Sequence, residues 1–500
     1  MGELPRFIVL GRPTGGVTYL RYVVERGAQH RRLHLSSPEV ISERNFTKLE
    51  VVRAPPTIGR DMVHIRSCYN NKFLVLESEG SNVFVAEADE PEVDRSIWSC
   101  TLFRVTYVNN RLSLLLQSSN AQHSVQVLSN SSLGIAVRNS PFAYWFDVTN
   151  MSTLAILPEY IAFKGDNNRY LNSRHIRTQN RLKYESTNLL DNGVHHQTQT
   201  LRNGNVRFRS IHFGRFWRKS NPEWIFGDSD DRTGSDINTV FRPIKLDGNK
   251  ISLLNLGNNR YCMRRVQGGQ PKLVDTLTAS SSTVGPLTVM EVEEAVRQRE
   301  IYNIHYNMDE SRVYNVAPFE SGNVTQDTYN LTPLPVVKRV GFKYTQVTRE
   351  TFNSSHSWKV AYNSKIKVTV IPKFVEGEAT LEASYDGKVE WSELNETIIT
   401  QTKDLFIPVP PMTKSIVTLI LGRGSVDVPF SYEQRDILPN GREVHKHMED
   451  GLFSGLNTEV FTHTVREISL STLSESELEE ARRLSVVDEE AAAPALSSKL

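Results

Sequence analysis

The chain has 500 residues, 39% hydrophobic and 23% charged, and its 58 lysines and arginines almost balance 57 acidic residues. This length predicts two to four domains, because single hydrophobic cores stop growing at about 250–300 residues. The net charge of +1 gives no electrostatic reason to expect a nucleic-acid or anionic-membrane partner. No apolar run approaches the ~18 residues of a transmembrane helix.

The N-terminus and the cysteines favour a protein of a reducing compartment. The opening MGELPRFIVLGRP is charged and lacks the apolar core of a signal peptide. The cysteines are few and odd in number, and they form no CxxC motif. We therefore expect buried or free thiols at Cys68, Cys100 and Cys262.

Six similar segments occupy the first 290 residues, each with a short alternating strand, a turn and a returning strand. Their starts advance by about 45 to 56 residues, a spacing typical of stacked or radial units. Residues 88–105 and 227–244, which follow the second and fifth copies, share an acidic loop and an apolar-Phe-Arg motif. The six copies therefore form two groups of three, which favours two threefold all-β units over a six-bladed propeller. The copies begin at Phe7, Val63, Leu112, Ile161, Val206 and Ile251.

The character of the sequence changes after residue 287. Residues 289–308 open with a charged stretch for which we expect a short helix. Long alternating strands rich in Ser and Thr then follow to about residue 435. From residue 471 the chain is acidic and rich in Ala and Ser, so we expect disorder apart from one or two helical turns at 475–484.

Residues 365–386, KIKVTVIPKFVEGEATLEASYD, predict a hairpin of two alternating strands. Strands at 363–371 and 378–388, with a tip at 371–375, would have the ~9–11 residues of a transmembrane β-strand. Insertion would need a ring of subunits, because only a closed barrel satisfies every backbone group in lipid. The same alternation fits a permanently soluble hairpin. Its apolar face consists of Ile366, Val368, Val370, Phe374, Ala379, Leu381, Ala383 and Tyr385.

Several motifs together resemble a known family. LPRFIVL, VHIRSCYNNKFLV, AFKGDNNRYL, FWRKS and LGNNRYC resemble the amaranthin-type plant agglutinins, and VPPMTKSIVTLILGRGSVDVPFSY resembles the aerolysin-like pore-forming module fused to them in many plants. The resemblance implies a mainly β fold with β-trefoil lectin domains at 1–152 and 153–286, an elongated aerolysin-like β domain at 287–470 and a tail at 471–500.

The same resemblance implies a non-enzymatic glycan-binding protein of stress or pest defence that assembles into a homo-oligomeric β-barrel pore in a membrane. The alternative is a cytosolic glycan-binding scaffold that never inserts. The family implies a cytoplasmic or nuclear location without secretion. Peroxisomal import through the terminal tripeptide Ser498, Lys499 and Leu500 is the alternative address.

The fifth copy provides the candidate sugar site, because sugar recognition needs an apolar platform and convergent polar groups. Trp217 and Lys219 share one face of a strand. The resemblance adds a contribution from the first trefoil of another subunit. There this chain lacks the Trp, His and Pro of its relatives, which leaves open whether the sugar is of galactosaminyl type. The alternative is that one tryptophan fills the core and the acids solvate a loop. The candidate set is Trp217, Lys219, Trp224, Asp228, Ser81 and Asn82.

No catalytic, metal or cofactor motif stands in a recognisable frame. The acidic run that starts at Asp228 has Thr233 where a calcium loop needs glycine. We expect no enzyme activity, no metal and no cofactor.

Overall fold

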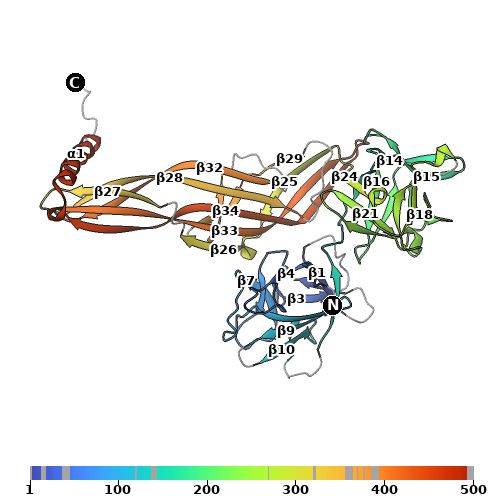
Figure 1. Ribbon diagram of the computed structural model, residues 1–500, viewed down its shortest axis with the longest axis horizontal. Helices are drawn as coiled ribbons and strands as arrows, with labels where there is room; N and C mark the ends of the chain where they lie inside the picture. The colour runs from blue at the N-terminus through green and yellow to red at the C-terminus, as the bar shows by residue number, and fades with distance from the viewer. Residues whose placement is uncertain are drawn as a thin grey trace.

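The computed structural model describes residues 3–12, 18–36, 45–118, 121–136, 143–267, 270–318, 323–354, 364–368, 370–375, 378–383 and 393–492. The protein is mainly β, as predicted, and it is elongated (Figure 1). A second all-β unit forms one end, a long β module extends from it to a terminal helix, and a first all-β unit lies beside the module. The targeting tripeptide predicted at Ser498, Lys499 and Leu500 lies outside the described residues.

The first unit is a sheet of twelve described strands in the order β11-β10-β9-β12-β1-β4-β5-β6-β7, with β2, β3 and β8 attached to it. Its three predicted copies begin at β1, β5 and β9, so each copy starts with a strand. The strands are β1 (Phe7–Gly11), β2 (Tyr19–Tyr22), β3 (Leu33–Ser36), β4 (Leu49–Arg53), β5 (Met62–Ser67), β6 (Phe73–Leu76), β7 (Phe84–Ala88), β8 (Phe103–Val108), β9 (Arg111–Gln117), β10 (Gln122–Val127), β11 (Leu133–Ile135) and β12 (Phe146–Asn150).

The second unit repeats this arrangement with twelve described strands in the order β14-β15-β19-β18-β17-β16-β13-β24-β21-β22-β23 and β20 between β17 and β21. Its copies begin at β13, β17 and β21. Three groups of four strands match the threefold all-β units predicted from the repeats. The strands are β13 (Tyr160–Lys164), β14 (Tyr170–Ile176), β15 (Gln179–Ser186), β16 (His196–Thr200), β17 (Val206–Ser210), β18 (Arg215–Ser220), β19 (Trp224–Ser229), β20 (Phe241–Lys245), β21 (Lys250–Asn255), β22 (Arg260–Arg264), β23 (Leu277–Ser281) and β24 (Met290–Glu294).

The expectation of a helix after residue 289 is wrong. Residues 290–294 form β24, which pairs with β13 and β21 and extends the second unit beyond the predicted boundary at 286. The charges that suggested a helix are satisfied by tertiary contacts. Tyr170 donates a hydrogen bond to Glu293, and Arg299 forms an ion pair with Glu294.

The C-terminal module contains an eight-stranded sheet in the order β29-β25-β33-β34-β28-β32, with β26 and β27 also paired to β33. The long strands predicted here are present, and β33 and β34 have 25 and 27 residues. The strands are β25 (Gln298–Tyr306), β26 (Arg312–Pro318), β27 (Val324–Asn330), β28 (Val336–Asn353), β29 (Ser364–Ile366), β32 (Leu394–Val409), β33 (Thr413–Ile437) and β34 (Glu443–Ser469).

The predicted hairpin is present with different strand bounds. β30 (Val370–Val375) pairs with β31 (Glu378–Ala383) as a separate two-stranded sheet. The predicted tip at 371–375 is therefore part of a strand, because Phe374 and Ile371 pack into the module core, which holds these residues extended. Val370 lies opposite Ala383, and Tyr385 lies outside the described residues.

The acidic tail differs from its prediction. Helix α1 (Glu475–Ala492) is longer than the one or two turns expected, and it packs Ala481 against Tyr329 and Leu470 of the module tip. Short 3-10 turns are η1 (Ile237–Thr239), η2 (Pro271–Leu273), η3 (Pro286–Thr288), η4 (Met308–Glu310) and η6 (Leu470–Thr472). In the described part of the chain, the helices fall short of the length and apolarity needed to cross a membrane.

Each unit has its own core. Cys68, Cys100 and Cys262 are buried free thiols, as predicted. Burial raises the pKa of Cys68 to about 11, so this thiol stays protonated. In the second unit Trp217 is 0% exposed and its ring lies 4.7 Å from that of Phe208 and 5.4 Å from that of Phe163, centroid to centroid. These rings fill the centre of the second unit.

We predict that Trp217→Ala lowers the free energy of unfolding of the second unit by ~3–5 kcal/mol, because truncating a buried Trp leaves a cavity. Chemical denaturation followed by circular dichroism measures the change. Trp98→Ala is the matched control, since Trp98 is exposed. Equal stability of Trp217→Ala and the unmodified chain would contradict the assignment of Trp217 to the core.

Candidate functional site

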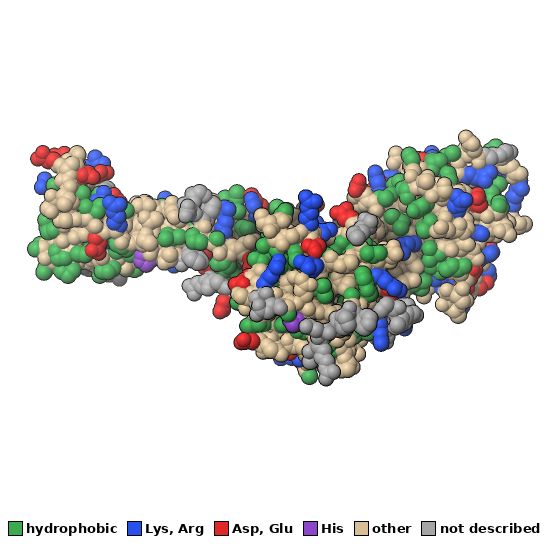
Figure 2. All heavy atoms as spheres, turned by 60° about the horizontal axis from the view of Figure 1, so that its bottom comes forward, with side chains coloured by type: hydrophobic (Ala, Val, Ile, Leu, Met, Phe, Trp, Pro, Cys, Tyr) green, Lys and Arg blue, Asp and Glu red, His purple; other side chains and the backbone are tan. Residues whose placement is uncertain are grey.

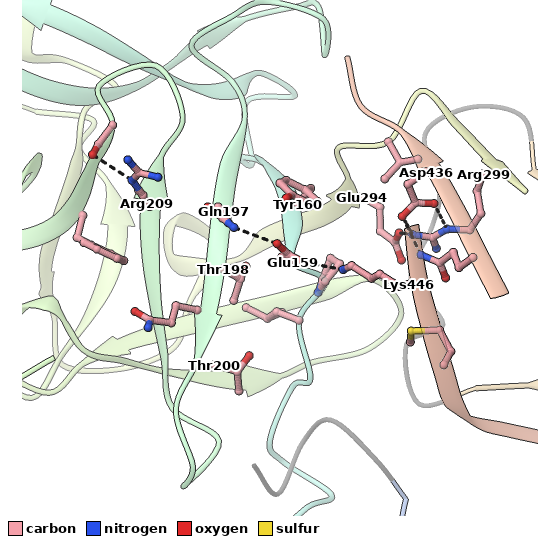
Figure 3. A pocket seen from close by; sticks show the side chains of 18 of the residues that line it. Glu159, Tyr160, Gln197, Thr198, Thr200, Arg209, Glu294, Arg299, Asp436 and Lys446 are labelled. Carbon is pink, nitrogen blue, oxygen red and sulfur yellow. Dashed lines mark hydrogen bonds and ion pairs between the residues drawn. The ribbon is translucent and has the colours of Figure 1, made fainter. Parts of the chain in front are cut away.

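A cavity of about 840 Å³ lies where the second unit meets the module (Figure 3). One wall comes from β16 to β18 and from the residues that lead into β13. The opposite wall comes from residues 434–436 of β33 and 446–449 of β34. Pockets that bind small ligands have volumes of ~300–1,000 Å³. The cavity is therefore large enough for a small polar ligand.

The aromatic residue of the fifth copy that faces the cavity is Phe216. Phe216 lines the cavity, whereas the neighbouring Trp217 packs in the core, and the pairing of β18 with β19 is irregular between these two residues. The guanidinium of Arg207 lies 4.1 Å from the centre of the Phe216 ring and covers one of its faces. The Trp217 indole N–H donates to Nδ1 of His196 at 3.3 Å. That nitrogen accepts because burial lowers the pKa of His196 to about 3.

Hydroxyl and amide groups on β16 add hydrogen-bonding capacity. Thr198 is 7% exposed, and its Oγ1 is buried without a hydrogen-bond partner among the described residues. A buried hydroxyl without a partner costs free energy, which a bound ligand or water would recover. Gln197 donates to Glu159 at 2.9 Å, and Gln199 accepts from Arg207 at 3.1 Å.

Two charged contacts join the walls of the cavity. Glu159 lies 2.5 Å from Nζ of Lys446, and Figure 3 shows their side chains pointing toward one another. Burial acts to raise the pKa of Glu159, but the hydrogen bond and charge of Lys446 outweigh it, so the pKa lies below its ordinary value.

The second contact is the ion triad, defined as Arg299 with Glu294 and Asp436. Arg299 Nε lies 2.8 Å from Asp436 Oδ1, and its Nη2 contacts Glu294. Burial acts to lower the pKa of Arg299, but the two carboxylates raise it on balance. The Arg299 guanidinium therefore stays charged.

Among the sugar-site residues predicted in the second unit, Trp217 is corrected by the structure, whereas Lys219, Trp224 and Asp228 stay a prediction. Trp217 fills the core and offers no platform to a ligand. Trp224 is half-buried between two guanidiniums. The centre of its ring lies 4.3 Å from the guanidinium carbon of Arg181 and 4.8 Å from that of Arg265. Asp228 accepts two hydrogen bonds from Arg218. Lys219, Trp224 and Asp228 do not line the cavity.

Ser81 and Asn82 lie in the first unit, in the turn between β6 and β7. The Ser81 hydroxyl accepts from the Val83 N–H at 3.2 Å, and the Asn82 carbonyl accepts from the Ile135 N–H at 2.8 Å. The structure does not bring them together with the cavity of the second unit. Their pairing with a second subunit stays a prediction.

Sequence reasoning missed most residues of the cavity. Phe216 could have been proposed from the sequence, because it lies next to Trp217 on a predicted strand and alternation places it on the opposite face. Thr198 and Gln197 stand in a polar strand with no motif. Lys446 belongs to a strand of the module far along the chain, so only the fold places it opposite Glu159.

The fold defines a class: a mainly β protein with two similar twelve-stranded units, followed by an elongated β module. The agglutinin domain family matches residues 3–130 and 155–294, which fall within the first and second units. These residues are more than half of the chain, and the chain therefore belongs to the agglutinin domain family. Comparison with curated proteins gave no match.

Three solved structures illustrate the overall resemblance. A lamprey immune protein is 12% identical, with 72% of this chain and 87% of that chain covered and a TM-score of 0.27. A mosquitocidal holotoxin is 12% identical, with 61% of this chain and 36% of that chain covered and a TM-score of 0.27. An aerolysin-like protein from Bombina maxima is 12% identical, with 34% of this chain and 99% of that chain covered and a TM-score of 0.19. Scores this low support no functional argument.

We predict that the Glu159–Lys446 pair stabilises the protein at neutral pH and that acid removes this effect. The pKa of Glu159 is lowered from 4.5, so the stabilisation is fully present above pH 4.5 and is lost as the pH falls through the lowered value. Glu159→Gln should therefore lower Tm at pH 7, with a difference that shrinks toward pH 3.

Thermal unfolding from pH 7 to 3 measures this difference, with the exposed Glu223→Gln as the matched control. A Tm difference for Glu159→Gln that stays constant across this range would show that the ion pair is not its source.

Proposed function

We propose that this protein is a non-enzymatic carbohydrate-binding protein whose second unit binds glycan in the cavity and whose module assembles with copies of itself and inserts a hairpin into a membrane. Membership of the agglutinin domain family supports glycan binding. The cavity supports it locally, since Phe216 supplies an apolar surface and Thr198 an unused hydroxyl. The galactosaminyl class and a role in stress or defence belong to the proposal.

The observation that carries the membrane step is the place of the hairpin in the sheet. β28 and β32 are antiparallel neighbours over a continuous ladder from the pair Val336 and Val409 to the pair Thr351 and Leu394. The hairpin of β30 and β31 lies within the segment that joins β28 to β32. If it left the module, β28 and β32 would extend into it as one long hairpin. A closed ring of such hairpins would leave no unpaired backbone in lipid.

Specific contacts hold the hairpin on the module. Phe374 is 1% exposed, and the Asn457 side chain bonds both its backbone N–H and its carbonyl, at 3.0 and 2.7 Å. Lys367 Nζ lies 2.6 Å from Glu300 of β25. β29 pairs with β25 in parallel. These contacts would hold the hairpin against the soluble monomer.

The outer strand β32 supports assembly of copies. Among the described strands it lies at the edge of the sheet. An edge strand presents unpaired backbone groups to other chains. Leu394, Ile398, Ile399 and Phe406 are exposed on this strand, and exposed hydrophobic side chains are visible along the module in Figure 2. A second copy would cover both the backbone and these side chains.

A second candidate function is a glycan-binding scaffold that never inserts. The burial of Phe374 favours it, because insertion must first remove this ring from the module core.

We predict that Phe216→Ala weakens glycan binding about tenfold, equal to ~1.4 kcal/mol, because the ligand loses the apolar wall of the cavity. A glycan array identifies the ligand and titration calorimetry measures its affinity. Trp224→Ala is the comparison, since Trp224 lies outside the cavity. Loss of binding in Trp224→Ala with none in Phe216→Ala would place the site on the outer face of the second unit instead.

Leu381→Lys tests the hairpin. Leu381 is 48% exposed in the monomer, so the soluble fold should tolerate a lysine there. In a lipid-facing strand the charge costs ~2–4 kcal/mol near the bilayer midplane, so dye release from liposomes carrying mixed glycolipids should fall about tenfold or more.

Leu190→Lys is the matched control, an exposed leucine of similar accessibility in the second unit. Release by the unmodified chain that Leu381→Lys retains would exclude this strand from the lipid face. Glycan binding without any release by the unmodified chain would support the scaffold function.

A further inference from the structure

A carboxylate of the module lies buried inside the first unit. Glu310, at the end of η4, is 1% exposed. Its Oε2 accepts hydrogen bonds from the Tyr22 hydroxyl at 2.5 Å and from the Asn70 amide at 3.2 Å. Its Oε1 accepts from Nε of Arg31 at 3.2 Å and lies 3.1 Å from Nε2 of His30. All four partners belong to the first unit.

The chemistry of this pocket selects a carboxylate. The four groups are a phenol, a carboxamide, a guanidinium and an imidazole. Two of them contact each oxygen of the Glu310 carboxylate. Tyr22 and Asn70 are fully buried, so their positions are fixed by the core of the first unit. Asn70 also donates to the Ala86 carbonyl at 3.1 Å, which orients its amide. The donors are therefore held in place by the first unit itself.

Further hydrogen bonds join the first unit to the module. Asn71 donates to Asp427 at 3.1 Å, Asn307 donates to the Tyr69 hydroxyl at 3.2 Å, and Arg312 donates to the Asp89 carbonyl. None of the hydrophobic clusters found in the described residues spans these two parts. Polar interfaces of this kind between domains are typical of parts that separate.

The other junction is different. Tyr160, Ala295, Val296 and Leu438 form one hydrophobic cluster between the second unit and the module. The second unit is thus held by apolar packing together with the ion triad, whereas the contacts around the buried Glu310 that hold the first unit are polar.

We propose that the pocket of Tyr22, His30, Arg31 and Asn70 is a carboxylate-binding site for an acidic sugar, a hexuronate or a sialate, and that Glu310 occupies it as an internal ligand. The first unit belongs to the agglutinin domain family, which points to a sugar, and the bound side chain points to its carboxylate. An acidic glycan displaces Glu310 and releases the first unit from the module. This site is separate from the cavity of the second unit, so each proposal can fail without the other.

The test measures binding of a glucuronate-terminated and a sialate-terminated oligosaccharide by titration calorimetry, with lactose as the neutral control. Glu310→Ala should bind one of the acidic oligosaccharides at least ~10-fold more tightly than the unmodified chain, because the internal competitor is gone. Lactose affinity should not change. Adding Arg31→Gln to Glu310→Ala should remove the gain. Which oligosaccharide gains affinity distinguishes the two acidic sugars.

Equal affinity of folded Glu310→Ala and the unmodified chain for both acidic oligosaccharides would overturn the proposal, as would a gain that survives Arg31→Gln. Small-angle X-ray scattering of the unmodified chain provides a second test that needs no variant. Its maximum dimension should increase at a saturating concentration of the acidic oligosaccharide and stay constant with lactose. No expansion with the acidic oligosaccharide would also overturn the release of the first unit.

Discussion

The ion triad of Arg299 with Glu294 and Asp436 is the constraint that fixes the second unit to the module. Its three members come from the end of β24, the start of β25 and the end of β33, so one guanidinium ties a strand of the second unit to the long central strand of the module. Removing one partner of such a buried group typically costs ~3–5 kcal/mol, because the remaining charge is left uncompensated. The Glu159–Lys446 pair forms a second tie, and the cavity is the space enclosed between these two contacts.

The module meets the second unit and the first unit through junctions held by different kinds of contact. Between the second unit and the module, charged contacts are backed by a hydrophobic cluster around Val296, which keeps the cavity walls in a fixed relation. Between the first unit and the module, hydrogen bonds and ion pairs surround Glu310, and no hydrophobic cluster of the described residues spans the junction. A ligand that competes with the Glu310 carboxylate for its hydrogen-bond partners would weaken the junction of the first unit. The junction of the second unit opens only when apolar surface becomes exposed to water.

Periodicity in the sequence predicted the architecture well, because it reports burial. The six copies, the long strands of the module and the hairpin all follow from alternation of apolar residues. The errors arose where tertiary partners override local composition. The acids of β24 suggested a helix, and only the fold places Tyr170 beside Glu293. Alternation showed that Trp217 and Phe216 face opposite ways, but it could not say which face was the core. Glu310 carried no signal at all, since its partners lie more than 200 residues away in the chain.

The hairpin shows why an alternating pattern alone does not decide between a soluble and a membrane strand. A soluble hairpin packs apolar side chains of one face against its own protein, and a membrane strand presents them to lipid, so both show the same alternation. Here Gly424 provides the space: a Cβ at this position would lie 2.4 Å from the Phe374 ring. Asn457 then satisfies the backbone of Phe374 on the same surface. The neighbouring Leu381 is left exposed, so the receptor surface covers only part of the apolar face. If the hairpin inserts as proposed, this leucine would lie on the lipid face of the strand, where an apolar side chain is required.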